Sequence, residues 1–263
     1  MDLKLKNKVA LVCAASEGLG KATAFELARE GARVAICSRN NKKLVSTQKE
    51  IEEEIGAEIE IFEADLEIHE DIKQLHKEVQ NKLGNIEILV NNTGGPPSGT
   101  FEKHTDEDWQ NAINLTMMSA LRMSQTVLPS MKEKKWGRII NISSVSVKTP
   151  VSNLFLSNTI RLSVLGWAKA LSDEVGQDGI TVNTVCPGST RTNRITSIYS
   201  NTSKQTGQSI EEIEEYSSQA IPLKRIGEPE ELAALIAFLA SERASYITGT
   251  AIQVDGGSNR SYY

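Results

Sequence analysis

Short apolar runs rich in Val and Ile alternate with longer amphipathic stretches along the whole chain. An apolar run of this kind predicts a buried strand, and a 3.6-residue apolar period predicts a helix that covers one face of a sheet. The expected strands are residues 8–14, 33–38, 58–63, 86–91, 137–143, 180–185 and 251–254. The expected helices include residues 20–29, 68–83, 106–131, 153–174 and 229–240. The alternation is typical of βαβ units and predicts an α/β fold, a doubly wound sheet of seven mostly parallel strands flanked by helices.

One segment, residues 191–222, does not follow this alternation. It is polar and rich in Ser and Thr, and it ends in the acidic run EEIEE. Such a segment is either a lid-like insertion over a site or a solvated loop. We expect a single domain over residues 1–263 that contains this segment.

Composition excludes several classes of protein. A chain of 263 residues buries about 70–75% of its unfolded surface and needs no disulfides for stability. The net charge of −5 does not favour nucleic acid or anionic membranes, and no apolar run has the length of a membrane span. Cys13, Cys37 and Cys186 are far apart in sequence, so we expect no metal site, no disulfide framework and a cytoplasmic location.

The first predicted strand is followed by a glycine-containing loop. It reads Ala15-Ser16-Glu17-Gly18-Leu19-Gly20 and leads directly into the first predicted helix. Backbone N–H groups at a helix start can face a pyrophosphate, and glycines let the phosphate come close. Alone, the loop also fits an ordinary tight turn between a strand and a helix.

Over nearly its whole length the chain resembles the short-chain dehydrogenase/reductase family, in particular its 3-oxoacyl-acyl-carrier-protein reductase-like branch. The family motif T-G-x-x-x-G-x-G falls on residues 13–20, where the first two residues differ and Gly18 and Gly20 are retained. Further matches follow in the family's order: Asp65-Leu66, Asn91-Asn92-Thr93-Gly94, Pro187-Gly188-Ser189-Thr190-Arg191-Thr192 and Val254-Asp255-Gly256-Gly257. The resemblance implies a Rossmann-type sheet and a nicotinamide cofactor.

The resemblance also assigns roles to individual residues. Asp65 would accept a hydrogen bond from the adenine amino group, while the backbone of Leu66 contacts the ring. The other implied cofactor residues are Ala14, Ser16, Gly18, Leu19, Gly20, Ser38, Arg39, Asn92, Gly94, Pro187, Gly188 and Thr192. Simpler interpretations exist for several of them, because Asp65 could cap a helix and the Asn, Gly and Pro residues could form turns.

The end of the second strand bears on the choice between NADP(H) and NAD(H). An acidic residue there would bind the ribose 2′-hydroxyl, whereas a nearby Arg accommodates a 2′-phosphate. This chain has Ser38 and Arg39, and Arg39 can pair with a phosphate unless it is an ordinary solvated residue. Glu17 in the glycine loop favours NAD(H), because relatives that use NADP(H) often carry a basic residue there. On balance the sequence favours NADP(H).

The catalytic positions differ from those of the family. Its tetrad contains a Ser after the fifth strand, a Tyr thirteen positions later, a Lys four beyond that, and an Asn on the preceding helix. Here Ser144 keeps the serine, while Ser157 and Arg161 occupy the tyrosine and lysine positions. The asparagine position falls on Thr116. Asn114, two residues and about 200° away on a helix, is interpreted as a surface or capping residue.

These exchanges leave two main hypotheses. In the first, the chain is an NADPH-linked reductase of a small 3-oxoacyl-like carbonyl compound. Ser144 and Ser157 then polarise the carbonyl, Arg161 supports charge, and water, Tyr199 or Tyr216 supplies the proton. In the second, it is a weak or inactive NADP(H)-binding protein that acts as a sensor or partner subunit. A purely structural protein is a third alternative. We favour the enzyme and, by resemblance, a homo-oligomer, either a tetramer or a dimer.

Overall fold

The computed structural model describes residues 2–261 and is built on one parallel sheet. The strands are β1 (Val9–Val12), β2 (Arg33–Ser38), β3 (Glu60–Glu63), β4 (Ile88–Asn91), β5 (Gly137–Ile142), β6 (Ile180–Pro187) and β7 (Ala251–Val254). Their order in the sheet is β3-β2-β1-β4-β5-β6-β7, and every pairing is parallel. The predicted doubly wound α/β fold is therefore confirmed. The chain reverses its direction of travel across the sheet between β1 and β4, the usual place for a ligand in such folds.

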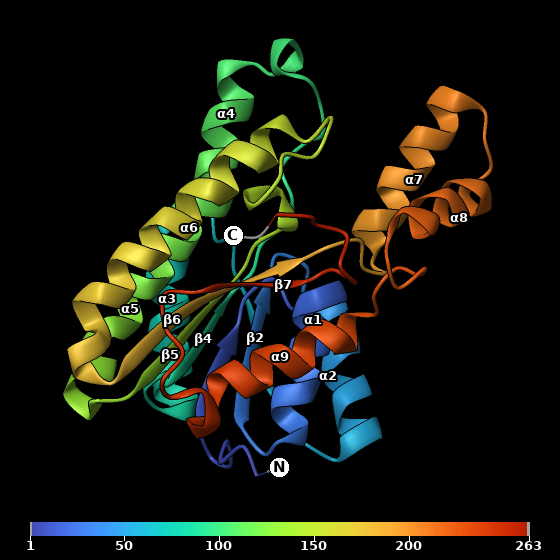
Figure 1. Cartoon of the computed structure of the whole chain (residues 1–263). Coiled ribbons are helices and arrows are strands. Elements are labelled where there is room, and N and C mark those ends of the chain that lie inside the picture. The colour runs from blue at the N-terminus through green and yellow to red at the C-terminus, as the bar shows by residue number, and fades with distance from the viewer. Residues whose placement is uncertain (1, 262–263) are drawn as a thin grey trace.

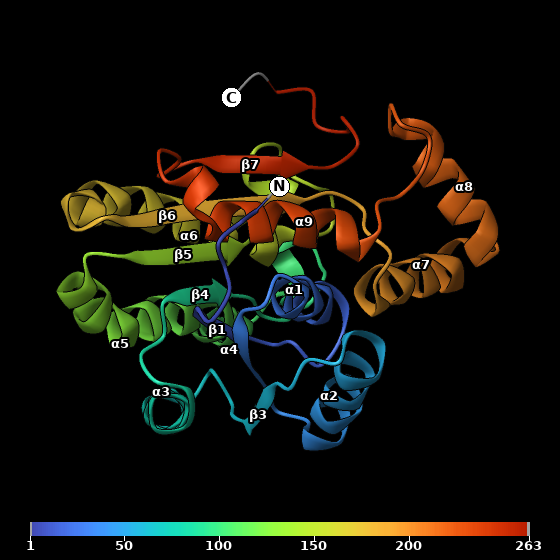
Figure 2. The ribbon, with the colours of Figure 1, turned by 90° about the horizontal axis from the view of Figure 1, so that it is seen from below.

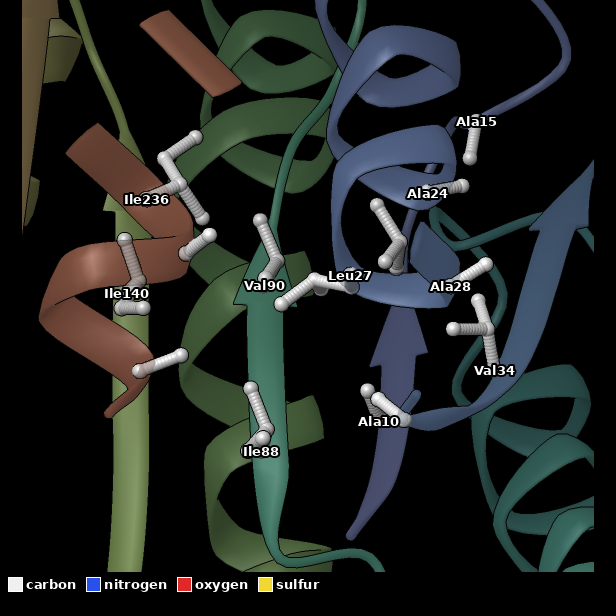
Figure 3. Packing of buried hydrophobic residues seen from close by; sticks show 14 of the residues in the cluster. Ala10, Ala15, Ala24, Leu27, Ala28, Val34, Ile88, Val90, Ile140 and Ile236 are labelled. Carbon is white, nitrogen blue, oxygen red and sulfur yellow. The ribbon is translucent and has the colours of Figure 1, made fainter. Parts of the chain in front are cut away.

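Helices cover both faces of this sheet (Figures 1 and 2). They are α1 (Gly18–Arg29), α2 (Asn41–Ile55), α3 (His69–Leu83), α4 (Asp106–Ala112), α5 (Ser119–Lys134), α6 (Phe155–Val175), α7 (Asn193–Thr206), α8 (Ile210–Ala220) and α9 (Pro229–Ala240). Side chains of β1 alternate between the faces, since Ala10 and Val12 join one apolar cluster while Leu11 joins the other. Figure 3 shows the first cluster, in which Leu27 of α1 and Ile236 of α9 pack on strands β1, β4 and β5.

The long helix predicted over residues 106–131 is interrupted. A π-helix (Ile113–Met118) separates α4 from α5. A π-turn adds a residue to the helical repeat and changes which side chains share a face, and it is frequent at functional sites. The prediction of one continuous helix was wrong because an apolar period of 3.6 residues does not reveal a single wider turn.

The polar segment 191–222 is mostly helical. It forms α7 and α8, which pack on each other and project beyond the sheet, away from the other helices (Figure 1). Gly207 ends α7 in the left-handed conformation at φ 77°, and Ser209 and Glu212 form a reciprocal capping box at the start of α8. The solvated-loop interpretation was therefore wrong, and the capping residues carried a signal of the helices.

Within residues 2–261, no helix combines the length and the apolar character that crossing a membrane requires.

Candidate active site

A cavity of about 910 Å³ opens at the carboxyl ends of the strands. Its wall includes the glycine loop, the segments that follow β2 to β6, and one side of α7. Every residue predicted to bind the cofactor lines this cavity except Gly20, and so do Ser144, Ser157 and Arg161. The fold therefore brings both predicted sets of residues to one place. The volume lies near the upper end of the range for small-molecule and cofactor sites.

The glycine loop holds an unusual backbone conformation. Ala14 has φ 46° and Gly18 has φ 58°, both in the left-handed region. A residue with a Cβ is strained there, which explains why a glycine suits the position of Ala14 in the family motif. The side-chain amide of Asn92, at the end of β4, donates to the carbonyl oxygen of Ala14 at 3.2 Å and ties the loop to the neighbouring strand.

Gly20 serves close packing and does not line the cavity. A Cβ at this position would lie 2.5 Å from the Ala14 carbonyl oxygen and 2.8 Å from Nδ2 of Asn92. Among the described residues, no side chain caps the start of α1, whose N-cap is Glu17. The first N–H groups of α1 are thus left without side-chain acceptors beside the cavity, which fits a pyrophosphate at this helix end.

Ser38, Arg39 and Asp65 lie together at the ends of β2 and β3. Nη1 of Arg39 is 3.3 Å from Oε1 of Glu67 and 3.8 Å from Oδ2 of Asp65. Arg39 is solvent-exposed and already faces the cavity. Asp65 accepts from the backbone N–H of Glu67 at 3.0 Å, whereas the N-cap of α3 is Ile68. Asp65 therefore closes a turn and does not cap the helix.

Lys43 is a cavity residue that the sequence analysis missed. Its Nζ lies 2.5 Å from Oε2 of Glu17, and the same carboxylate oxygen accepts from Nδ2 of Asn193 at 3.1 Å. The hydrogen bond from Lys43 lowers the pKa of Glu17. Lys43 offsets the negative charge of Glu17. Glu17 therefore repels a bound phosphate less than its position in the glycine loop suggests.

The two serines at the catalytic positions differ in their surroundings. Oγ of Ser144 accepts from the backbone N–H of Ser146 at 3.1 Å and caps a short 3₁₀-helix (Val145–Val147). Ser157 lies in the first turn of α6, is buried, and makes no side-chain hydrogen bond to the described residues. Both hydroxyl groups can therefore donate to an acceptor in the cavity.

Arg161 is a buried cation. Its Nη1 donates to the carbonyl oxygens of Ile142 and Ser143, each at 3.2 Å, at the end of β5. Burial lowers the pKa of Arg161 to about 10, and the charge of Arg194 on α7 is the second cause. The guanidinium stays protonated at neutral pH. Its Nε and Nη2 hydrogens make no hydrogen bond within residues 2–261 and remain available to a ligand.

The π-helix turns Thr116 inward and leaves Asn114 outside the cavity wall. Thr116 is buried, and its hydroxyl has no partner among the described residues. Together with Arg161 it lines a second, much smaller cavity. Asn114 is half-buried and accepts from Nε2 of Gln110 at 3.5 Å.

The two tyrosines considered as proton donors lie in different environments. Tyr199 of α7 is 5% exposed and lines the cavity, and its hydroxyl is enclosed without a hydrogen-bond partner in the described structure. Tyr216 of α8 is 81% exposed and does not line the cavity. Of the two candidate proton donors, which the sequence could not rank, only Tyr199 therefore lies at the cavity.

Comparison with known proteins finds similarity along nearly the whole chain. A family model described as enoyl-(acyl carrier protein) reductase matches residues 13–259. The 3-oxoacyl-acyl-carrier-protein reductase FabG of Aquifex aeolicus is 34% identical over 257 residues, 98% of this chain and 99% of that protein. The NADPH-dependent reductase BacG of Bacillus subtilis is 32% identical over 258 residues, 98% of this chain and 100% of that protein.

The structure is likewise similar to solved structures of reductases. The structure of L-sorbose reductase from Gluconobacter frateurii, a complex with NADPH and L-sorbose, matches with a TM-score of 0.94 and 30% identity. The match covers 99% of this chain and 100% of that chain. The sheet, the glycine loop and the segment after β6 all fall within the matched length.

Proposed function

We propose that the chain, an oxidoreductase that belongs to the short-chain dehydrogenase/reductase family, reduces the carbonyl group of a small molecule with NADPH. One observation carries the proposal. Ser144, Ser157 and Arg161, which occupy three of the four catalytic positions, line the same cavity as the glycine loop and the end of β2. A 3-oxoacyl-like compound is the substrate class that the family resemblance favours.

The residues of the cavity fit the cofactor. In the proposal, the uncapped start of α1 binds the pyrophosphate, and Ser38 and Arg39 bind the 2′-phosphate. Pro187, Gly188 and Thr192 bind the nicotinamide carboxamide. When bound, NADPH supplies the hydride that carbonyl reduction requires.

The chain's own residues stabilise the oxygen of the reacting carbonyl. Ser144 and Ser157 donate hydrogen bonds to this oxygen, and the buried charge of Arg161 favours the negative charge that develops on it. A serine hydroxyl is too weak an acid to end the reaction by giving up its proton. Arg161 holds its proton at neutral pH, so the final proton comes from another group.

Tyr199 is the proposed proton donor. A tyrosine has an ordinary pKa of about 10 and is a usable acid near neutral pH. Its enclosed hydroxyl has no partner within residues 2–261, and the residue belongs to the cavity wall. In the proposal, the segment 191–222 acts as a lid, and its closure brings the Tyr199 hydroxyl to the carbonyl oxygen. Water then returns the proton to the tyrosinate.

The second candidate function is a weak or inactive NADP(H)-binding protein. The observation in its favour concerns Arg161. Its Nη1 donates to the backbone carbonyl groups of Ile142 and Ser143, and this is a structural role that requires no reaction. Turnover distinguishes the two functions. A protein that binds NADPH and reduces no carbonyl compound would be the sensor or partner subunit.

Arg39 tests the cofactor preference. We expect Arg39→Ala to raise the Kd for NADPH about 10-fold and leave the Kd for NADH unchanged, because only NADPH offers a phosphate to the guanidinium. Fluorescence titration of both nucleotides measures this. Arg29→Ala is the control, since Arg29 pairs with Glu26 on α1 and does not line the cavity. Equal affinity of the Arg39 variant and the unmodified protein for NADPH would refute the assignment.

A cytoplasmic homotetramer is part of the same proposal. Leu162, on α6, is 51% exposed, and Tyr246, ahead of β7, is fully exposed. Both suit burial against a second copy of the chain. Cys13, Cys37 and Cys186 are unpaired, which suits a reducing compartment. Light scattering gives the number of chains per particle directly.

A further inference from the structure

The wall of the large cavity carries more positive than negative side chains. Its cationic residues are Arg39, Lys43, Lys103, Arg161, Arg194 and Lys204, and its acidic residues are Glu17 and Asp65. Each acid is near a cation, because Glu17 pairs with Lys43 and Asp65 lies 3.8 Å from Arg39. The other four cations form no ion pair within residues 2–261.

Arg194 is held in a defined position by the opposite wall. It is the second residue of α7, and its Nη2 donates to the carbonyl oxygen of Pro96 at 2.9 Å. A Cβ on Gly95 would lie 3.1 Å from the guanidinium atoms, so a glycine gives Arg194 room to lie against the loop. The remaining N–H groups of Arg194 make no hydrogen bond in the described part of the chain and are available to a ligand.

Arg194 and Arg161 act on the same region of the cavity. Both side chains line the large cavity, and the charge of Arg194 contributes to lowering the pKa of Arg161. The guanidinium of Arg161, on α6, donates to the end of β5, and that of Arg194 donates to the loop after β4. An anion that binds in the cavity near both positive charges is attracted by each of them.

The proposed function assigns the phosphates of NADPH to residues other than this pair. In the proposed function the pyrophosphate binds at the start of α1 and the 2′-phosphate at the end of β2. Arg161 instead donates to the end of β5 and Arg194 to the loop after β4, and both line the cavity that contains Ser144 and Ser157. The two guanidinium groups are therefore available to a second anion, that of the substrate.

We infer that the substrate is an oxo acid whose carboxylate is bound by Arg194, with Arg161 adding to the attraction. The inference rests on the proposed function, because it names the substrate class of the same site. A guanidinium binds a carboxylate through paired, charge-assisted hydrogen bonds, which fixes the orientation of the acid as well as its affinity.

The experiment compares acids with their neutral esters. Pyruvate, acetoacetate and levulinate are titrated by calorimetry into the NADPH-loaded protein, each beside its methyl ester. We expect at least one acid to bind about 10-fold or more tightly than its ester. Arg194→Gln should weaken this acid about 10- to 100-fold and leave both its ester and NADPH unchanged. Arg194→Lys should retain part of the preference, since it keeps the charge without the planar fork.

Arg191→Gln is the matched control. Arg191 is three positions away, does not line the cavity, and pairs with Glu214 and Glu228 at the surface. It should keep the preference for acids. Equal binding of acids and esters, no binding of any acid, or an equal loss in both variants would overturn the inference. A weaker affinity of Arg194→Gln for NADPH alone would also overturn it and make Arg194 a cofactor ligand.

The binding results separate this inference from the proposed function. Reduction of esters and acids at equal efficiency would support the proposed reductase activity and refute the carboxylate site. Selective binding of an acid without oxidation of NADPH would support the carboxylate site and refute the proposed reductase activity.

Discussion

The double variant Ser144→Ala and Ser157→Ala is expected to lose NADPH-dependent carbonyl reduction while it still binds NADPH. Both hydroxyl groups line the cavity, and in the proposed mechanism both donate to the carbonyl oxygen. Loss of one such donor lowers kcat by about 10²- to 10³-fold, and loss of both leaves no side-chain hydroxyl at the two catalytic positions. The measurement is NADPH oxidation at 340 nm beside a fluorescence titration with NADPH.

Ser146→Ala controls for the removal of a serine hydroxyl near the site. Ser146 is buried two residues after Ser144, does not line the large cavity, and its hydroxyl has no partner in the described structure. Only its backbone N–H contacts Ser144, and this contact survives the substitution. Full activity of the Ser144 and Ser157 double variant would remove both serines from the mechanism.

Tyr199→Phe is expected to lower kcat by about 10²-fold or more, the usual contribution of a positioned general acid. The hydroxyl makes no hydrogen bond to the described residues, so its removal breaks no native contact and should leave the thermal midpoint nearly unchanged. The affinity for NADPH should also stay the same. A loss of kcat without a loss of stability or binding is the signature that a structural role would not produce.

Tyr216→Phe is the matched control for the tyrosine variant. Tyr216 lies on the same helical segment but is 81% exposed and does not line the cavity. It should behave as the unmodified protein. If Tyr199→Phe and Tyr216→Phe retain equal activity, the proton comes from water and Tyr199 has no role in the reaction.

The sheet was predictable because its inner strands are buried on both faces and read as largely apolar runs. β2 and β7 were predicted with the bounds that the structure shows. Elsewhere the errors were short and had local causes. The first strand was predicted to reach Ala14, whereas β1 ends at Val12 because the chain turns into the left-handed conformation at Ala14. The sixth strand continues to Pro187, two residues beyond the prediction.

The residues that line the cavity at the proposed cofactor site were predictable for a related reason. Parallel strands end at one edge of a sheet, so motifs that follow successive strands meet there whatever their separation in sequence. The glycine loop, Asp65, Asn92 and Pro187 are far apart in the chain and line one cavity. Gly20 is the exception. It does not line the cavity, and its missing side chain lets α1 pack closely against Ala14 and Asn92.

The charges of the site could not be predicted. Lys43 and Arg194 match no motif in the sequence, and only the fold shows that they line the cavity. Sequence order also gave no means of pairing Glu17 with Lys43 and Asn193, because this contact joins α1, α2 and α7. The π-turn that contains Thr116 also leaves no periodic signal in the sequence.

The measurement that tests the reductase most directly follows the hydride itself. The protein is incubated with NADPH that carries deuterium at C4, in separate samples labelled on each face, together with oxo acids and their methyl esters. Mass spectrometry of the alcohol products should find one deuterium from one of the two labelled cofactors. Binding of NADPH with no deuterium in any product would contradict the account and leave the chain as a nucleotide-binding protein without this chemistry.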